Sequence, residues 1–168
     1  MRTLPLLVVV LVAACGNAKP IESLSAFAEH GATTSQRNPS PFDITAVAQE
    51  GEGGELLAMT LRNISDGPVT LSDASMPWVY QNLDVAAIAT DGRVVVNSYP
   101  IIDTWPTKEV TLLPGQSVSG SYTLRNGLNL TPKDRASDLI ILWSYLPVEE
   151  GKVFDKITGV ALLPKKQQ

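Results

Sequence analysis

The chain has 168 residues, and 13 lysines and arginines against 17 aspartates and glutamates give it a formal net charge of −4. An acidic chain lacks the basic footprint that nucleic-acid binding requires, and it gives no reason to expect adhesion to anionic lipid head groups. Hydrophobic residues make up 44% of the sequence, which is enough for the core of one domain of ordinary size.

The first predicted element is a signal sequence over residues 1–14. Arg2 supplies a positive charge, residues 4–12 form an apolar run, and small residues precede the single cysteine, Cys15. This order is typical of a secretory signal, and the run is shorter than the roughly 20 residues that span a bilayer. The alternative interpretation is an ordinary signal peptide followed by a buried thiol.

The four residues Val12-Ala13-Ala14-Cys15 resemble the lipobox of bacterial lipoproteins. The resemblance implies cleavage before Cys15, diacylation of its sulfur and acylation of its new amino group. Two or more acyl chains anchor a protein stably, whereas one chain gives marginal binding. Gly16 and Asn17 stand where lipoproteins retained in the inner membrane carry aspartate, which implies an outer-membrane location facing the periplasm.

Residues 15–41 are predicted to form a lipidated flexible tether. They are mostly small and polar and include three prolines, although Leu24–Phe27 can form a short helical turn. The tether also holds His30, the single histidine of the chain. Without histidine or cysteine beyond residue 41, the domain lacks the usual base, thiol nucleophile and soft metal ligands. We therefore predict no enzyme activity, no metal site and no cofactor.

Residues 42–164 are predicted to form the domain, and residues 165–168 a short tail. Apolar and polar residues alternate in short segments between turns, most clearly at Leu139, Ile141, Trp143 and Tyr145. About seven or eight such strands predict an all-β, antiparallel two-sheet sandwich of the immunoglobulin-like class, without a disulfide and with Trp143 between the sheets. Residues 130–136 can add one helical turn. A closed barrel is the alternative.

Two turn motifs carry a second resemblance. Residues 61–71 read Leu-Arg-Asn-Ile-Ser-Asp-Gly-Pro-Val-Thr-Leu, and residues 110–118 read Val-Thr-Leu-Leu-Pro-Gly-Gln-Ser-Val. Both resemble segments of bacterial immunoglobulin-like domains. With Asp91-Gly92-Arg93 between them, their order is similar to that of the bacterial intracellular proteinase inhibitor family. The resemblance implies the sandwich fold and makes protease inhibition an alternative function.

Four aromatic residues in predicted loops are candidate partner-binding residues: Trp78, Tyr80, Tyr99 and Trp105. Exposed tryptophan and tyrosine favour recognition because they give a large contact area at low entropic cost. The alternative is that these rings cover the open end of the sandwich, where the core needs bulky side chains.

Acidic residues supply a further alternative. Asp134 and Asp138 flank Arg135, and three more aspartates, Asp66, Asp73 and Asp84, lie in a loop-rich region. Two facing carboxylates could hydrolyse a glycoside, although acidic residues in turns commonly cap or solvate the loop. The sequence as a whole predicts an envelope lipoprotein, tethered to the membrane, that acts as a non-enzymatic binding or accessory module for an envelope protein or polymer.

Overall fold

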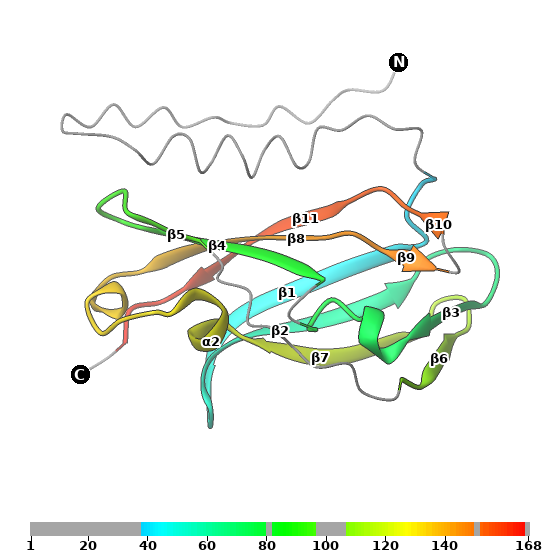
Figure 1. Ribbon diagram of the computed structural model, residues 1–168, viewed down its shortest axis with the longest axis horizontal. Helices are drawn as coiled ribbons and strands as arrows, with labels where there is room; N and C mark the ends of the chain where they lie inside the picture. Colours follow the sequence, from blue (N-terminus) through cyan, green and yellow to red (C-terminus); the bar gives the residue numbers. More distant parts are fainter. Residues whose placement is uncertain (1–37, 80–81, 97–106, 150–151, 167–168) are drawn as a thin grey trace, which may run out of the picture.

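The computed structural model describes residues 38–79, 82–96, 107–149 and 152–166, in which two antiparallel sheets lie face to face (Figure 1). The first sheet has the order β1-β2-β7. Its strands are β1 (Phe42–Gly51), β2 (Gly54–Asn63) and β7 (Ser117–Thr123). The second sheet has the order β11-β8-β4-β5. Its strands are β4 (Leu83–Ala89), β5 (Val94–Val96), β8 (Leu139–Tyr145) and β11 (Ile157–Leu163). A three-stranded and a four-stranded antiparallel sheet with these strand orders form an immunoglobulin-like sandwich. The predicted all-β, two-sheet fold is therefore confirmed.

Shorter elements connect these sheets. They are two small ladders, β3 (Val69–Ser72) with β6 (Glu109–Leu112) and β9 (Val148–Glu149) with β10 (Lys152–Val153), and three helical segments, η1 (Asp73–Ser75), α2 (Leu124–Leu128) and η2 (Asp134–Ala136). Eight of the described strands have four residues or more, in agreement with the seven or eight expected. Helix α2 was not predicted: the alternation of β7 stops at Thr123, and Leu124 turns into the core instead.

Alternating side chains of both sheets fill the space between them. Leu57, Met59 and Leu61 of β2 face Leu139, Ile141 and Trp143 of β8 within one buried cluster. Trp143 is only 4% exposed, which confirms its predicted place between the sheets. Its ring lies over Gly159, the residue paired with it on β11, where any side chain would collide with the indole. Glycine at this register position therefore makes room for the largest ring in the core.

The two turn motifs of residues 61–71 and 110–118 meet at Asn63, a fully buried polar residue. Its Nδ2 donates to the carbonyl oxygens of Gly67 (2.8 Å) and Leu112 (2.9 Å), and its Oδ1 accepts from the Ser65 backbone (2.9 Å). The Asn63 backbone also bonds the second turn, which Gly115 enters with a φ of 77°. One side chain thus holds together two turns about fifty residues apart in sequence.

Candidate functional surface

The outward side of the second sheet is aliphatic over two neighbouring rows of residues. Two rows of paired residues run across it: Ala86, Leu142 and Val160 in one row, and Val94, Ile88, Ile140 and Leu162 in the next. These seven residues are called the aliphatic face below. Residues paired across neighbouring strands point to the same side of a sheet. The aliphatic face is therefore continuous across all four strands.

Its residues are not all covered by the domain. Val160 is 64% exposed, Leu162 59% and Ile140 44%, whereas Ala86 in the middle is buried. An antiparallel sheet with one face in water usually alternates between apolar and polar residues. Strands β4, β8 and β11 break that rule, because they are apolar on both sides over these rows. Strands of this kind are typical of a sheet that is covered on both faces.

The outward side of the first sheet has the opposite character. Thr45, Thr60 and Ser119 form a row across β1, β2 and β7, and Thr60 Oγ1 lies 2.9 Å from Ser119 Oγ. Ser121 continues this hydroxyl-rich face, on which Val47 is an exposed aliphatic residue. The contrast between the two outward faces shows that the aliphatic face is a property of one sheet and not of the whole surface.

A polar row borders the aliphatic face on the side nearest β10. Asp84 of β4 and Ser144 of β8 are register partners, and Ser144 Oγ donates to Asp84 Oδ2 at 3.2 Å. Lys156 Nζ lies 3.0 Å from the same carboxylate oxygen. The charges at this border neutralise each other, so the row limits the apolar area without adding a net charge to it.

The opposite end of the sandwich holds an ion-pair cluster. Arg135, 5% exposed, donates through Nε to Glu55 Oε1 at 2.9 Å and through Nη2 to the Pro164 carbonyl at 2.9 Å. Burial by itself raises the pKa of Glu55, but hydrogen bonds from its own backbone and from Arg135 outweigh that effect and lower the pKa overall. Arg135 thus acts as a clamp between β2 and the chain after β11.

Three of the aspartates predicted as possible catalytic residues, Asp134, Asp138 and Asp73, have structural roles. Asp134 Oδ2 accepts hydrogen bonds from Thr131 Oγ1 (2.6 Å) and the Thr131 backbone (2.9 Å), and Arg93 pairs with Oδ1. The Thr131 hydroxyl is the main reason that the pKa of Asp134 is lowered. Asp138 accepts from the Lys165 backbone, and Asp73 from the Lys108 backbone. Each of these carboxylates has a structural partner.

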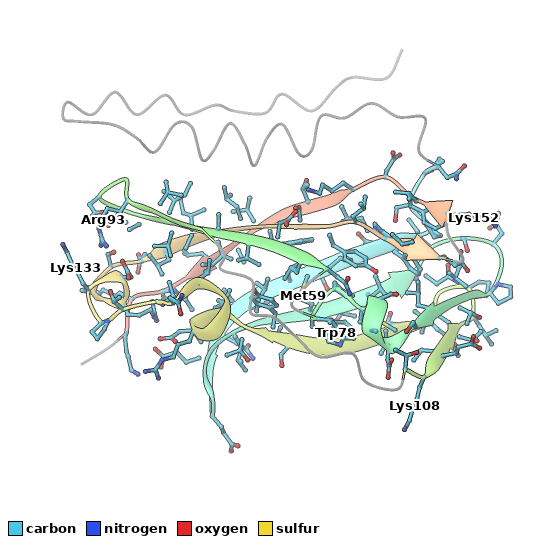
Figure 2. All side chains as sticks on the ribbon, in the orientation of Figure 1. Met59, Trp78, Arg93, Lys108, Lys133 and Lys152 are labelled. Atoms are coloured by element: carbon cyan, nitrogen blue, oxygen red, sulfur yellow. The ribbon has the colours of Figure 1, made fainter. Side chains whose placement is uncertain are left out.

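Of the four predicted aromatic residues, the structure describes Trp78. It follows η1 and precedes β4 in the sequence. Its side chain is partly buried and packs against the core (Figure 2). Its indole lies over Gly120 of β7, so closely that a Cβ at Gly120 would collide with the ring. This position agrees with the alternative of a ring that covers the core. Tyr80, Tyr99 and Trp105 lie outside the described residues, as does Cys15.

Sequence reasoning did not identify the aliphatic face. The alternation at Leu139, Ile141, Trp143 and Tyr145 correctly located the buried side of β8. The residues between them, Ile140 and Leu142, are also aliphatic, and this was the available signal. When the odd-numbered and the even-numbered residues of a strand are both apolar, both faces of the strand are expected to be covered by other groups.

Within the described ranges, no group of three histidine, cysteine, aspartate or glutamate side chains is placed to hold a metal ion. In that same part of the chain, no helix has the length and apolar character needed to cross a bilayer.

No family model matches the chain, and a comparison with curated proteins finds no match. Among solved structures, the chain is similar to beta-glucuronidase 2 of Bacteroides uniformis, covalently bound to cyclophellitol-6-carboxylate aziridine, with 14% sequence identity and a TM-score of 0.28. The similar region covers 73% of this chain and 13% of the glucuronidase, so the chain spans about an eighth of that protein. A likeness at this score supports no conclusion about function.

Proposed function

We propose that the protein is an envelope lipoprotein, anchored through Cys15, that acts as a non-enzymatic binding module and docks a short apolar segment of another envelope protein on its aliphatic face. The observation that supports this proposal most directly is the unbroken aliphatic surface across β11-β8-β4-β5. Strands that are apolar on both sides are typical of a sheet that is covered on both faces. The lipobox resemblance supplies the anchor, and residues 16–37 supply the connection to the domain.

The chemistry of the face favours a protein over other partners. Carbohydrates and nucleic acids are recognised through polar groups, aromatic stacking and basic side chains, and the seven residues of the face provide none of these. A lipid surface would also demand basic residues around the apolar area. Two cations beside the face are already paired, Lys156 with Asp84 and Arg93 with Asp91 and Asp134, and the chain is acidic. An apolar segment of a protein needs no polar, aromatic or basic group on the face, and so it is the partner that fits these seven residues.

Site-specific photo-crosslinking in the intact envelope tests this proposal. A photoreactive amino acid at Ile140 or Val160 would be compared with the same group at Thr45 or Ser121 on the hydroxyl-rich face. We expect one defined protein adduct from the aliphatic face, and none of the same mass from the other face. Equal labelling from both faces, adducts to lipid alone, or no adduct at all would contradict the proposal.

The anchor has a separate test. In the full chain, mass spectrometry of the mature protein should find acyl groups on Cys15 and no residues before it. The variant Cys15→Ser should keep the unprocessed signal sequence and lose the acyl groups. An unmodified Cys15 thiol on the exported protein would contradict the tethering part of the proposal, while the crosslinking result would still stand.

A further inference from the structure

We propose, building on the function above, that the protein's own tether covers the aliphatic face when no partner is bound. The occupant is the segment from Ile21 to Phe27, and a partner must displace it. The face would thus be regulated by a competing part of the same chain. Three observations carry this inference: the size of the face, the pattern of the segment, and the point at which the tether meets the domain.

The size of the face favours a small occupant. Four strands about 4.8 Å apart and two rows of residues about 7 Å apart give a footprint of roughly 250 Å². A stable complex between two copies of the chain would bury about 800 Å² on each. The face provides about a third of that area, and the polar row at Asp84 and Ser144 prevents its extension toward β10. A short amphipathic segment fits this area better than a second copy does.

The segment has a matching pattern. Ile21, Leu24 and Phe27 follow one another at intervals of three, and the residues between them include Glu22, Ser23 and Ser25. Apolar residues at this interval lie on one side of a helix, with Ser23 and Ser25 at its two edges and Glu22 on the opposite side. Two turns of helix would present three apolar side chains to the sheet, in the manner of a helix laid on an apolar groove.

The tether also meets the domain at a suitable point. Asn38 forms a parallel bridge with Phe154, and the Asp155 backbone donates to the Asn38 carbonyl at 2.9 Å. This places the junction just before β11, whose residues Val160 and Leu162 lie about 17 and 23 Å further along an extended strand. The ten residues between Phe27 and Asn38 can span up to about 33 Å. The segment can therefore reach both rows of the aliphatic face.

A disulfide test uses the full, lipidated chain, in which the sulfur of Cys15 is already bound to lipid. The pair Leu24→Cys with Ile140→Cys is compared with Leu24→Cys with Thr45→Cys. Thr45 is exposed on the opposite face and lies only seven residues beyond Asn38, so random collisions would reach it readily. A disulfide requires the two Cα atoms to approach within about 7 Å.

We expect the first pair to form a disulfide in most molecules under mild oxidation, and the second pair in several-fold fewer. Equal yields for the two pairs would overturn the inference. The single variant Ile140→Cys controls for any reaction with Cys15, because an unlipidated Cys15 would form a bond with it.

A second measurement separates the two proposals. Leu24→Asp should remove the segment from the face and increase, by several-fold, the partner adduct obtained from the photoreactive group at Val160. Ala26→Asp, about 160° around the helix from Leu24, should leave the yield unchanged. An adduct that is present but insensitive to Leu24→Asp would exclude the competing tether and keep the docking function. No adduct in any variant would exclude the docking function itself.

Discussion

Asn63 shows how one buried polar side chain can determine the geometry of a whole edge of the domain. Both of its amide hydrogens are used by carbonyl groups, from Gly67 and from Leu112, and its oxygen accepts from the backbone and hydroxyl of Ser65. Replacing one partner of a buried hydrogen bond leaves the other without compensation, which costs about 1–3 kcal/mol for each group. Asn63 has several such partners at once.

The variant Asn63→Ala should therefore lower the free energy of unfolding by about 2–4 kcal/mol, because the carbonyls of Gly67 and Leu112 lose their donors. Urea denaturation measures this difference. Ser65→Ala is the control, since it leaves both donors in place and should cost about 1 kcal/mol or less. Equal losses for the two variants would show that the amide is not what holds the turns together.

Trp78 offers a second test at the residue scale. Its indole lies over Gly120, and Gly120→Ala would force the ring aside, so we expect a loss of about 1–3 kcal/mol and a red shift in tryptophan fluorescence. Gly67→Ala is the control, because a Cβ there meets nothing within 4 Å. A loss as small as that of the control would mean that Trp78 contributes little to the packing.

At the scale of whole strands, alternation predicted the buried faces well. Phe42, Ile44 and Ala48 of β1 and Leu57, Met59 and Leu61 of β2 all face the core, and the predicted turn at Pro114-Gly115 has glycine at positive φ. Local chemistry decides these features: a side chain points to one face or the other, and a turn needs a residue that tolerates its dihedral angles.

Features that depend on distant partners could not be predicted in the same way. The sequence around Arg135 does not reveal that Glu55, eighty residues earlier, lies beside it. Nor does the loop around Trp78 reveal that Gly120 lies beneath its ring. Alternation also identifies only one apolar side of each strand. It therefore did not indicate the aliphatic face on the other side of β4, β8 and β11. Their outer residues differ from core residues only in what the fold places opposite them.

Two neighbouring isoleucines on β8 test this distinction. Ile141 is fully buried between the sheets, and Ile140 points outward and is 44% exposed. Ile141→Thr should cost about 2–4 kcal/mol, because it removes core volume and buries a hydroxyl, while Ile140→Thr should stay within about 0.5 kcal/mol. Thermal or urea unfolding measures both. Comparable losses would mean that the aliphatic face contributes to the stability of the isolated domain.

For the molecule as a whole, stability should depend on pH through the ion-pair cluster. The pKa values of Glu55, Asp91 and Asp134 are all lowered in the folded state, the last two chiefly by hydrogen bonds from Arg93 and Thr131 respectively. A carboxyl with a lowered pKa adds stability that is complete above its unfolded value, near pH 4, and that is lost as the pH falls through the folded value.

We therefore expect the free energy of unfolding to decrease between about pH 5 and about pH 2 as these carboxylates take up protons. Glu55→Gln should reduce this decrease, because glutamine cannot titrate, and it should lower stability at neutral pH by leaving Arg135 without its charged partner. Glu52→Gln, in the exposed β1–β2 turn, is the control and should behave like the unaltered protein. An unchanged pH dependence in Glu55→Gln would refute this assignment.

The position of Asn38 has a mechanical consequence. If the protein is anchored as proposed, tension from the lipid would act on the domain at this residue, at the end of the sandwich beside β10, whereas Ile140 and Leu162 lie toward the other end of their strands. Tension between the anchor and a partner held at those residues would run along the strands. The hydrogen bonds between β11 and β8 would then share the load in shear, instead of breaking one after another.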